Sequence, residues 1–214
     1  MLSPLLDLLF PPKCPFCRRL LERDEMLLCS DCQRDLPWTQ GLTGERTGEF
    51  FDRCVSPLWY LDTVRESHHR YKFSGARSYA APYATLMAQC AADRLEGGFD
   101  MLTWVPLSPK RRRKRGYDQA ELLARELAQR LELPVECLLD KVRDAPAQSG
   151  LKGESARRAN VLGAYDLRPG AQAAGKRILL VDDVVTTGTT LSECARVLRT
   201  AGADRVTCIT LARA

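Results

Sequence analysis

Aromatic and histidine side chains are scarce in this 214-residue chain: aromatic residues make up 7% of it, and His68 and His69 are its only histidines. Adjacent residues on a helix point about 100° apart, so this pair is a poor metal site, and we expect both at the surface or behind a site. No stretch approaches the ~20 consecutive apolar residues that span a bilayer, so the sequence predicts no membrane span. The apolar start, residues 2–10, contains Asp7 and lacks a basic flank, which predicts a short helix rather than a signal peptide.

Charge of one sign is concentrated in one place. The chain carries a formal net charge of +5, and six consecutive cations occupy residues 110–115, so the rest of the chain is close to neutral. A positive potential that is local in this way marks a site for an anion. The remaining composition, 45% hydrophobic and 28% charged, is that of a globular protein, and the length suffices for one main domain plus a small module.

Nine cysteines, an odd number, occur without a secretory signal, which favours a reducing compartment and predicts a cytoplasmic location. Four of them form two Cys-x-x-Cys pairs separated by eleven residues: Cys14, Cys17, Cys29 and Cys32. Two such pairs commonly hold a tetrahedral Zn²⁺, which replaces the core that so small a segment cannot build. We therefore predict a zinc-ribbon-like module over residues 1–45, with a redox dithiol as the alternative. The single cysteines are expected to be small buried residues; they are Cys54, Cys90, Cys137, Cys194 and Cys208.

Beyond residue 50, the hydrophobic pattern alternates between strands and helices. Alternation of this kind is typical of a doubly wound, mainly parallel sheet, so we expect an α/β domain over residues 50–214. Residues 37–50 are predicted to be a linker and residues 144–160 a long loop. The expected strands cover residues 55–61, 101–105, 178–181 and 205–211, and the expected helices cover 62–73, 78–95, 117–131 and 189–201.

Residues 178–190 hold the most specific signal. Four apolar residues predict a buried strand, and Asp182 and Asp183 follow at its carboxyl end, where open α/β sheets bind ligands. Next come Thr186-Thr187-Gly188-Thr189-Thr190, a loop that opens a helix and whose free N–H groups suit a phosphate. Two neighbouring carboxylates can accept hydrogen bonds from sugar hydroxyls or hold a hydrated Mg²⁺. The segment therefore predicts a site for a ribose and its 5′-phosphate, with an ordinary strand–turn–helix as the alternative. No Gly-Lys-Ser/Thr ends the loop, which excludes a Walker A motif.

This segment resembles the phosphoribosyl-pyrophosphate (PRPP) binding motif of type I phosphoribosyltransferases, which consists of a hydrophobic strand, an acidic pair and a Thr/Gly loop. The resemblance implies that Asp182 and Asp183 face the ribose hydroxyls and that Thr186, Thr187, Gly188, Thr189 and Thr190 wrap the 5′-phosphate. It also implies the type I phosphoribosyltransferase fold, a doubly wound and mainly parallel sheet.

A second set of residues extends the resemblance over nearly the whole chain. In order along the sequence come Pro106-Leu107, the basic run, Arg115-Gly116-Tyr117-Asp118-Gln119, Gln148, Arg157 or Arg158, and Asn160. Together with the four-cysteine module, they resemble the ComF family of competence-associated proteins and relatives linked to gluconate utilisation. Asp118 replaces the asparagine of that family, which argues against a ligand role for this residue. A further cysteine pair of many relatives is absent, so we expect no second metal site.

Pyrophosphate needs cations and backbone N–H donors, and arginine is favoured because its fork matches phosphate oxygens. We expect Lys110 and Arg115 near a pyrophosphate, with Lys72 as a further candidate, and Gly116 lets the backbone approach the ligand closely. Arg157 is a candidate catalytic residue, because its loop corresponds to one that closes over the ligand in the superfamily. The alternatives are a solvated run of charge and an exposed linker.

Three functions fit these residues. The first is a transferase that binds PRPP with Mg²⁺, releases pyrophosphate and transfers phosphoribose to an unidentified acceptor, with Asp182, Asp183 and Arg157 at the reacting centre. The second is an adaptor of the competence machinery that contacts single-stranded DNA through the zinc module and the basic run, although this run lacks the aromatic residues on which bases stack. The third is a PRPP-sensing protein without turnover. The acceptor and the oligomeric state, including a homo-oligomer, stay open.

Overall fold

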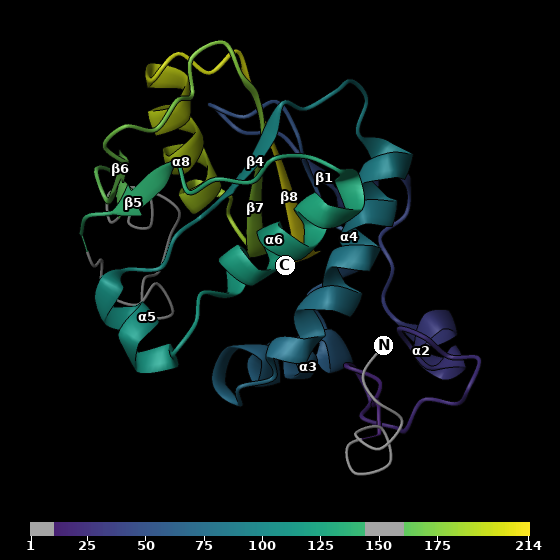
Figure 1. Cartoon of the computed structure of the whole chain (residues 1–214). Coiled ribbons are helices and arrows are strands. Elements are labelled where there is room, and N and C mark those ends of the chain that lie inside the picture. The colour runs from purple at the N-terminus through teal and green to yellow at the C-terminus, as the bar shows by residue number, and fades with distance from the viewer. Residues whose placement is uncertain (1–10, 144–160) are drawn as a thin grey trace.

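The computed structural model describes residues 11–143 and 161–214, and its centre is a six-stranded sheet (Figure 1). The order across the sheet is β1-β2-β8-β7-β4, and β3 pairs with the far end of β8. All neighbours are parallel except β1 and β2. The strands are β1 (Glu45–Arg46), β2 (Cys54–Val55), β3 (Leu58–Trp59), β4 (Met101–Trp104), β7 (Arg177–Val185) and β8 (Arg205–Arg213).

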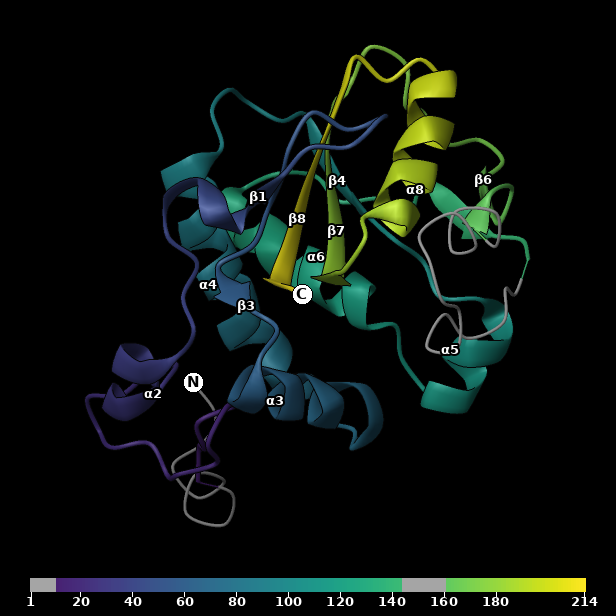
Figure 2. The same cartoon turned by 180° about the vertical axis from the view of Figure 1, so that it is seen from behind.

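Helices cover both faces of the sheet, as the views from opposite sides show (Figures 1 and 2). On one face, Leu179 and Val181 of β7 pack with α3 (Asp62–Phe73), α4 (Ala80–Arg94) and α6 (Gln119–Leu131). On the other face, Ile178 and Leu180 pack with α8 (Thr189–Thr200) and with the hairpin of β5 (Leu139–Lys141) and β6 (Tyr165–Leu167). Side chains of a strand alternate between its two faces, so one apolar run serves both layers. The predicted doubly wound, mainly parallel α/β architecture is confirmed.

Three segments differ from the sequence prediction. The strand expected to end at Val181 continues to Val185, because Val184 and Val185 still pair with β8. The strand expected over residues 55–61 is divided into β2 and β3, with Pro57, which has no N–H to donate, between them. Residues 37–50 are more than a linker, since they contain a 3-10 turn (Gly41–Gly44) and β1, which extends the sheet.

The basic run forms a helix that the sequence reading did not predict, α5 (Pro109–Arg115). Ser108 caps it by accepting the N–H of Arg111, Pro109 occupies the first turn, and Gly116 ends it with φ of +82°. These are ordinary start and stop signals for a helix. Two further short helices are α2 (Ser30–Asp35), which follows Cys29, and a 3-10 turn (Arg77–Tyr79) before α4.

Two predictions fall on residues that the structure does not describe, the short helix over 2–10 and the long loop over 144–160. Within residues 11–143 and 161–214, none of the helices combines the length and the apolar character that a bilayer crossing requires.

Asp118 joins α6 to the loop after β4. Its Oδ1 accepts the N–H groups of Ala120 (3.1 Å) and Glu121 (3.3 Å), and its Oδ2 accepts the N–H of Leu107 (2.7 Å). Because the side chain is only 3% exposed, water cannot replace these bonds. The structure therefore gives Asp118 a structural role.

We predict that Asp118→Ala lowers the free energy of unfolding by about 2 kcal/mol, since it removes a helix cap and leaves the Leu107 N–H without its partner. Asp118→Asn should lose less, because its amide oxygen can still cap α6. Urea unfolding of the three proteins measures the difference. An alanine variant as stable as the wild type would contradict this role.

Candidate functional site

The acidic pair lies near the carboxyl end of β7, beside α3. Lys72 Nζ and His68 Nε2, both on α3, lie 3.0 Å and 3.3 Å from Asp183 Oδ2, and Asp182 Oδ1 accepts the N–H of Asp183 (2.8 Å). His68 is 2% exposed, and its Nδ1 lies 3.0 Å from the hydroxyl of Tyr60. Of the two positions predicted for His68, at the surface or behind a site, the structure shows the second: the side chain is buried and contacts Asp183.

The two carboxyl groups have opposite protonation tendencies. Burial raises the pKa of Asp182 well above its usual range, and the negative charge of Asp183 adds to this effect. Burial also disfavours the charged form of Asp183, but the adjacent Lys72 and His68 outweigh it and hold the pKa of this carboxyl far below its usual range. The free site therefore keeps one firmly ionised carboxylate and one that tends to retain its proton.

The loop from Thr186 to Thr190 leads into α8 and borders a small pocket of about 260 Å³. Gly188 has φ of +80° and precedes the first residue of the helix, so the N-terminal N–H groups of α8 face this loop. Thr187 Oγ1 lies 2.8 Å from Thr189 Oγ1, and the guanidinium of Arg46 donates to the Thr187 carbonyl (2.7 Å). The pocket is also lined by Tyr60, His68, Lys72, Asp182 and Asp183.

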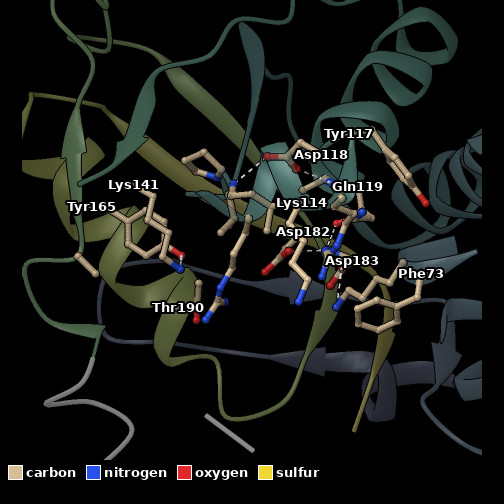
Figure 3. Close-up of a pocket in the computed structure, with 18 of the residues that line it drawn as sticks. Phe73, Lys114, Tyr117, Asp118, Gln119, Lys141, Tyr165, Asp182, Asp183 and Thr190 are labelled. Carbon is tan, nitrogen blue, oxygen red and sulfur yellow. Dashed lines mark hydrogen bonds and ion pairs between the residues drawn. The ribbon is translucent and has the colours of Figure 1, made fainter. Parts of the chain in front are cut away.

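A larger cavity of about 790 Å³ adjoins this pocket and shares Lys72, Asp182, Asp183 and Thr190 with it. In Figure 3 the acidic pair lies between Lys141 and Tyr165, which belong to the β5–β6 hairpin, and Tyr117 and Phe73 on the opposite side. The basic residues that line this larger cavity are Lys72, Arg111, Lys114, Arg115 and Lys141. The acidic pair thus stands at the junction of a loop pocket and a cation-lined cavity.

The structure brings most of the predicted residues together, with some changes among the cations. Arg115 lines the cavity, where it donates to Gln119 Oε1 and lies over the ring of Phe73. Lys110 is exposed and does not line the cavity, whereas Arg111 and Lys114 do. The reason is the helix: residues 111, 114 and 115 share one face of α5, and residue 110 does not.

Other predicted residues take different places. Gly116 ends α5 and its carbonyl accepts from Arg77, so its described role is in the backbone turn. Arg157 lies outside the described residues. The sequence reading missed Arg46, Tyr60, Lys141 and Tyr165. Only Lys141 and Tyr165 could have been found from the sequence, by recognising the β5–β6 hairpin. These two residues lie opposite each other in the register of that hairpin, so their side chains are expected to be neighbours.

The four cysteines of the N-terminal pairs converge. The Sγ atoms of Cys14, Cys17, Cys29 and Cys32 all lie within 4.8 Å of one another, and three of these residues are buried. Such a set of thiols fits a tetrahedral zinc ion, which the cluster would hold as a structural site with four protein ligands and no open position. Cys54 is not part of this cluster. It lies in β2, opposite Cys208 in the register with β8, and its side chain is buried in the central sheet as a free thiol.

Comparison with known proteins supports both parts of the chain. Residues 118–214 match the model of the phosphoribosyl transferase domain, and residues 5–56 match the double zinc ribbon domain. The chain is 29% identical to competence protein F of Haemophilus influenzae, over 94% of this chain and 97% of the relative. It is 30% identical to the DNA utilization protein YhgH of Salmonella typhimurium, over 92% of this chain and 94% of the relative. The chain belongs to the ComF family.

Among solved structures, this ComF-family protein is similar to the glutamine PRPP amidotransferase of B. subtilis. The two are 22% identical with a TM-score of 0.44, over 65% of this chain and 30% of the other. The family assignment therefore depends on the sequence relatives. It confirms the predicted resemblance to ComF proteins and, with the domain match, the type I phosphoribosyltransferase fold beside a zinc ribbon.

We predict that Asp182→Asn stabilises the free ComF-family protein. An unfolded aspartate ionises near pH 4, whereas the pKa of Asp182 in the folded chain is raised, so the native state binds more protons above that pH and wild-type stability falls as pH rises. Asparagine removes this loss and keeps the oxygen that accepts the Asp183 N–H. The gain should be on the order of 1 kcal/mol at pH 7.

Chemical unfolding at several pH values tests this expectation. The difference between Asp182→Asn and wild type should grow upward from about pH 4 and vanish below it. The lowered pKa of Asp183 acts in the opposite sense and below that window, and both proteins retain it. The exposed Asp93→Asn is the matched control and should show no such slope. A variant less stable than wild type at pH 7 would refute the reasoning.

Proposed function

We propose that this ComF-family protein binds PRPP together with Mg²⁺ and transfers its phosphoribose group to an acceptor, releasing pyrophosphate. The observation that carries the proposal is the position of the acidic pair between a helix-opening loop and a cavity whose described lining includes five basic side chains. A ligand with a phosphate at one end, a sugar diol in the middle and a pyrophosphate beyond it matches this order of charges.

The roles follow from the lining of the two pockets. The N–H groups and hydroxyls of Thr186–Thr190 bind the 5′-phosphate, since a helix N-terminus favours an anion. Asp182 and Asp183 accept the ribose hydroxyls. Arg115 and Lys72 face the pyrophosphate, and Arg111 and Lys114 join them in place of Lys110. Arg157 stays a prediction from sequence.

Two carboxylates next to a polyphosphate ligand are the protein contribution that Mg²⁺ usually receives. Bound there, it would neutralise charge on the departing pyrophosphate. The low pKa of Asp183 favours its ionised form in the free protein. Lys72 contacts Asp183 and also lines the cavity, so its ammonium group can interact with a bound anion as well.

The chemistry is a displacement at the anomeric carbon. A nitrogen of the acceptor forms the new bond to this carbon, the carbon–oxygen bond to pyrophosphate breaks, and the electron pair leaves with pyrophosphate. The acceptor nitrogen then loses its proton. Positioning and stabilisation of the leaving charge do the work, so no protein nucleophile is required.

Relatives named for competence and DNA utilisation connect the family to DNA uptake, and we infer a cytoplasmic role there. Lys110 and Arg113 are exposed on α5 and outside the cavity lining, which places them where they could contact a phosphate backbone, whereas the exposed Arg112 pairs with Glu121 (3.0 Å). No aromatic residue lies within the run, so single-stranded DNA binding stays the alternative function.

We predict saturable binding of PRPP with Mg²⁺ to the zinc-loaded protein in calorimetric titration. Asp183→Asn should weaken it at least tenfold, since the ionised carboxylate is lost, and Asp182→Asn should weaken it as well. Asp93→Asn, exposed on α4, should bind like the wild type. Unchanged binding in both site variants would remove PRPP from this site.

A second measurement separates transfer from sensing. The wild type is mixed with PRPP, Mg²⁺ and panels of purines, pyrimidines and aromatic amines, and released pyrophosphate is quantified. Release that depends on one acceptor class and is lost in Asp183→Asn supports transfer. Binding without release under any acceptor favours a sensor.

A further inference from the structure

Helix α3 touches both the zinc module and the acidic pair. In both views it lies between the purple part of the chain that follows residue 10 and the carboxyl ends of β7 and β8 (Figures 1 and 2). Nothing in the proposed reaction requires a metal module at this place. The contacts on the two sides of α3 indicate what the module does.

On the module side, α3 holds the backbone between two of the metal-binding cysteines. Ser67 Oγ donates to the Pro15 carbonyl, and the guanidinium of Arg70 donates to the carbonyls of Pro15 (3.1 Å) and Phe16 (2.6 Å). Ser67 is fully buried, and the Phe16 ring packs against Tyr83 of α4 at 5.5 Å between centroids. No water can replace the carbonyl that the buried Ser67 hydroxyl contacts, and Arg70, whose side chain is 21% exposed, adds two charge-assisted bonds to the same turn.

On the site side, the same two turns of helix place the partners of the carboxylate. His68 and Lys72 are four residues apart and therefore share a face, and both contact Asp183. Ser67 precedes His68, and Arg70 lies between His68 and Lys72 in sequence. A small rotation or shift of α3 would thus move both partners of Asp183 together.

We propose that Ser67 and Arg70 are positioning residues that couple the zinc site to the ligand site. Zinc on the four thiolates fixes the Cys14–Cys17 turn, whose carbonyls anchor α3, and α3 sets Lys72 and His68 against Asp183. Zinc occupancy therefore raises the affinity of the neighbouring site for a phosphorylated ribose. This inference rests on the proposed function, because it regulates the same site.

Reciprocity gives the test its sharpest form. If zinc strengthens PRPP binding by some factor, PRPP must strengthen zinc binding by the same factor. We expect PRPP with Mg²⁺ to raise the zinc affinity of the wild type at least fivefold, measured by competition with a chromophoric chelator. A module that merely stabilises the fold without communicating with the site shows no such effect of the ligand.

The variants separate positioning from general stability. Arg70→Ala keeps all four cysteines, so it should retain one zinc per chain while binding PRPP at least tenfold more weakly, with the ligand effect on zinc affinity abolished. Arg70→Lys keeps one charged donor and should recover part of both. Arg65→Ala, an exposed arginine on the same helix, is the matched control and should behave like wild type.

The outcomes distinguish the two proposals. PRPP binding that is equal in wild type and Arg70→Ala, with zinc affinity indifferent to PRPP, overturns the coupling and leaves the proposed function intact. If the wild type binds no PRPP, the proposed function fails, and hydrogen exchange decides the coupling alone. Arg70→Ala with zinc bound should then exchange faster than Arg65→Ala across residues 64–72 and 182–188, and equal rates would reject the coupling.

Discussion

The placement of two neighbouring carboxyl groups near the carboxyl end of β7, with Asp183 buried and Asp182 half-buried, is the constraint around which this molecule is arranged. An unpaired charge in such a place is costly, and the described residues place basic groups at salt-bridge distance from only one of the two. Lys72 and His68 stabilise Asp183 as an anion, while Asp182 has no described cation at salt-bridge distance and tends to keep its proton. The free site is thereby held in an electrostatically unfavourable state, which the proposed ligands, a sugar diol and Mg²⁺, would relieve, so that stability is exchanged for binding.

That constraint requires α3 to lie against the sheet, and a network of buried hydroxyls and rings fixes it there. Tyr71 of α3 donates to the carbonyl of Gln119 (2.9 Å), and Tyr117 donates in turn to the carbonyl of Tyr71. Tyr71 also packs edge-on against Tyr83 of α4. Through Gln119, which accepts from Arg115, the same network reaches the cations of α5. The two charged walls of the cavity are therefore positioned by one continuous set of packed side chains.

Sequence patterns foresaw the parts of this arrangement that depend on local order. The parallel strands, the long helices, the Thr/Gly loop and the four cysteines each carry their signal within a few residues, and the structure has them all. The end of β7 was placed too early because an acidic pair looks like a strand terminus, whereas pairing with β8 continues through it. Six adjacent cations concealed α5, although Ser108, Pro109 and Gly116 carry its start and stop signals.

Contacts between distant segments could not be foreseen. Arg46 meets Thr187 across 141 positions of sequence, and His68 meets Asp183 only because α3 packs beside β7. Neither residue belongs to a motif that gives its partner. Without the helix period of α5, Lys110 was as good a candidate for the cavity as Arg111. The residues that tune the charge of the site are thus the least visible ones in the sequence.

Packing between the N-terminal module and the α/β domain is a further feature that the sequence did not predict. A division at residue 45 follows composition, yet Phe16, Leu28 and Leu36 belong to the same apolar cluster as α3, α4 and α6. The segment is too short to bury these side chains alone. It packs them against the helices of the larger domain, and its four thiols provide a metal site that stabilises the rest of the segment. A metal-binding segment that shares its core with the helix behind the ligand site cannot shift without disturbing that helix, since close-packed interiors transmit displacement. The continuity of the core therefore connects the four-cysteine cluster to the proposed phosphoribose site.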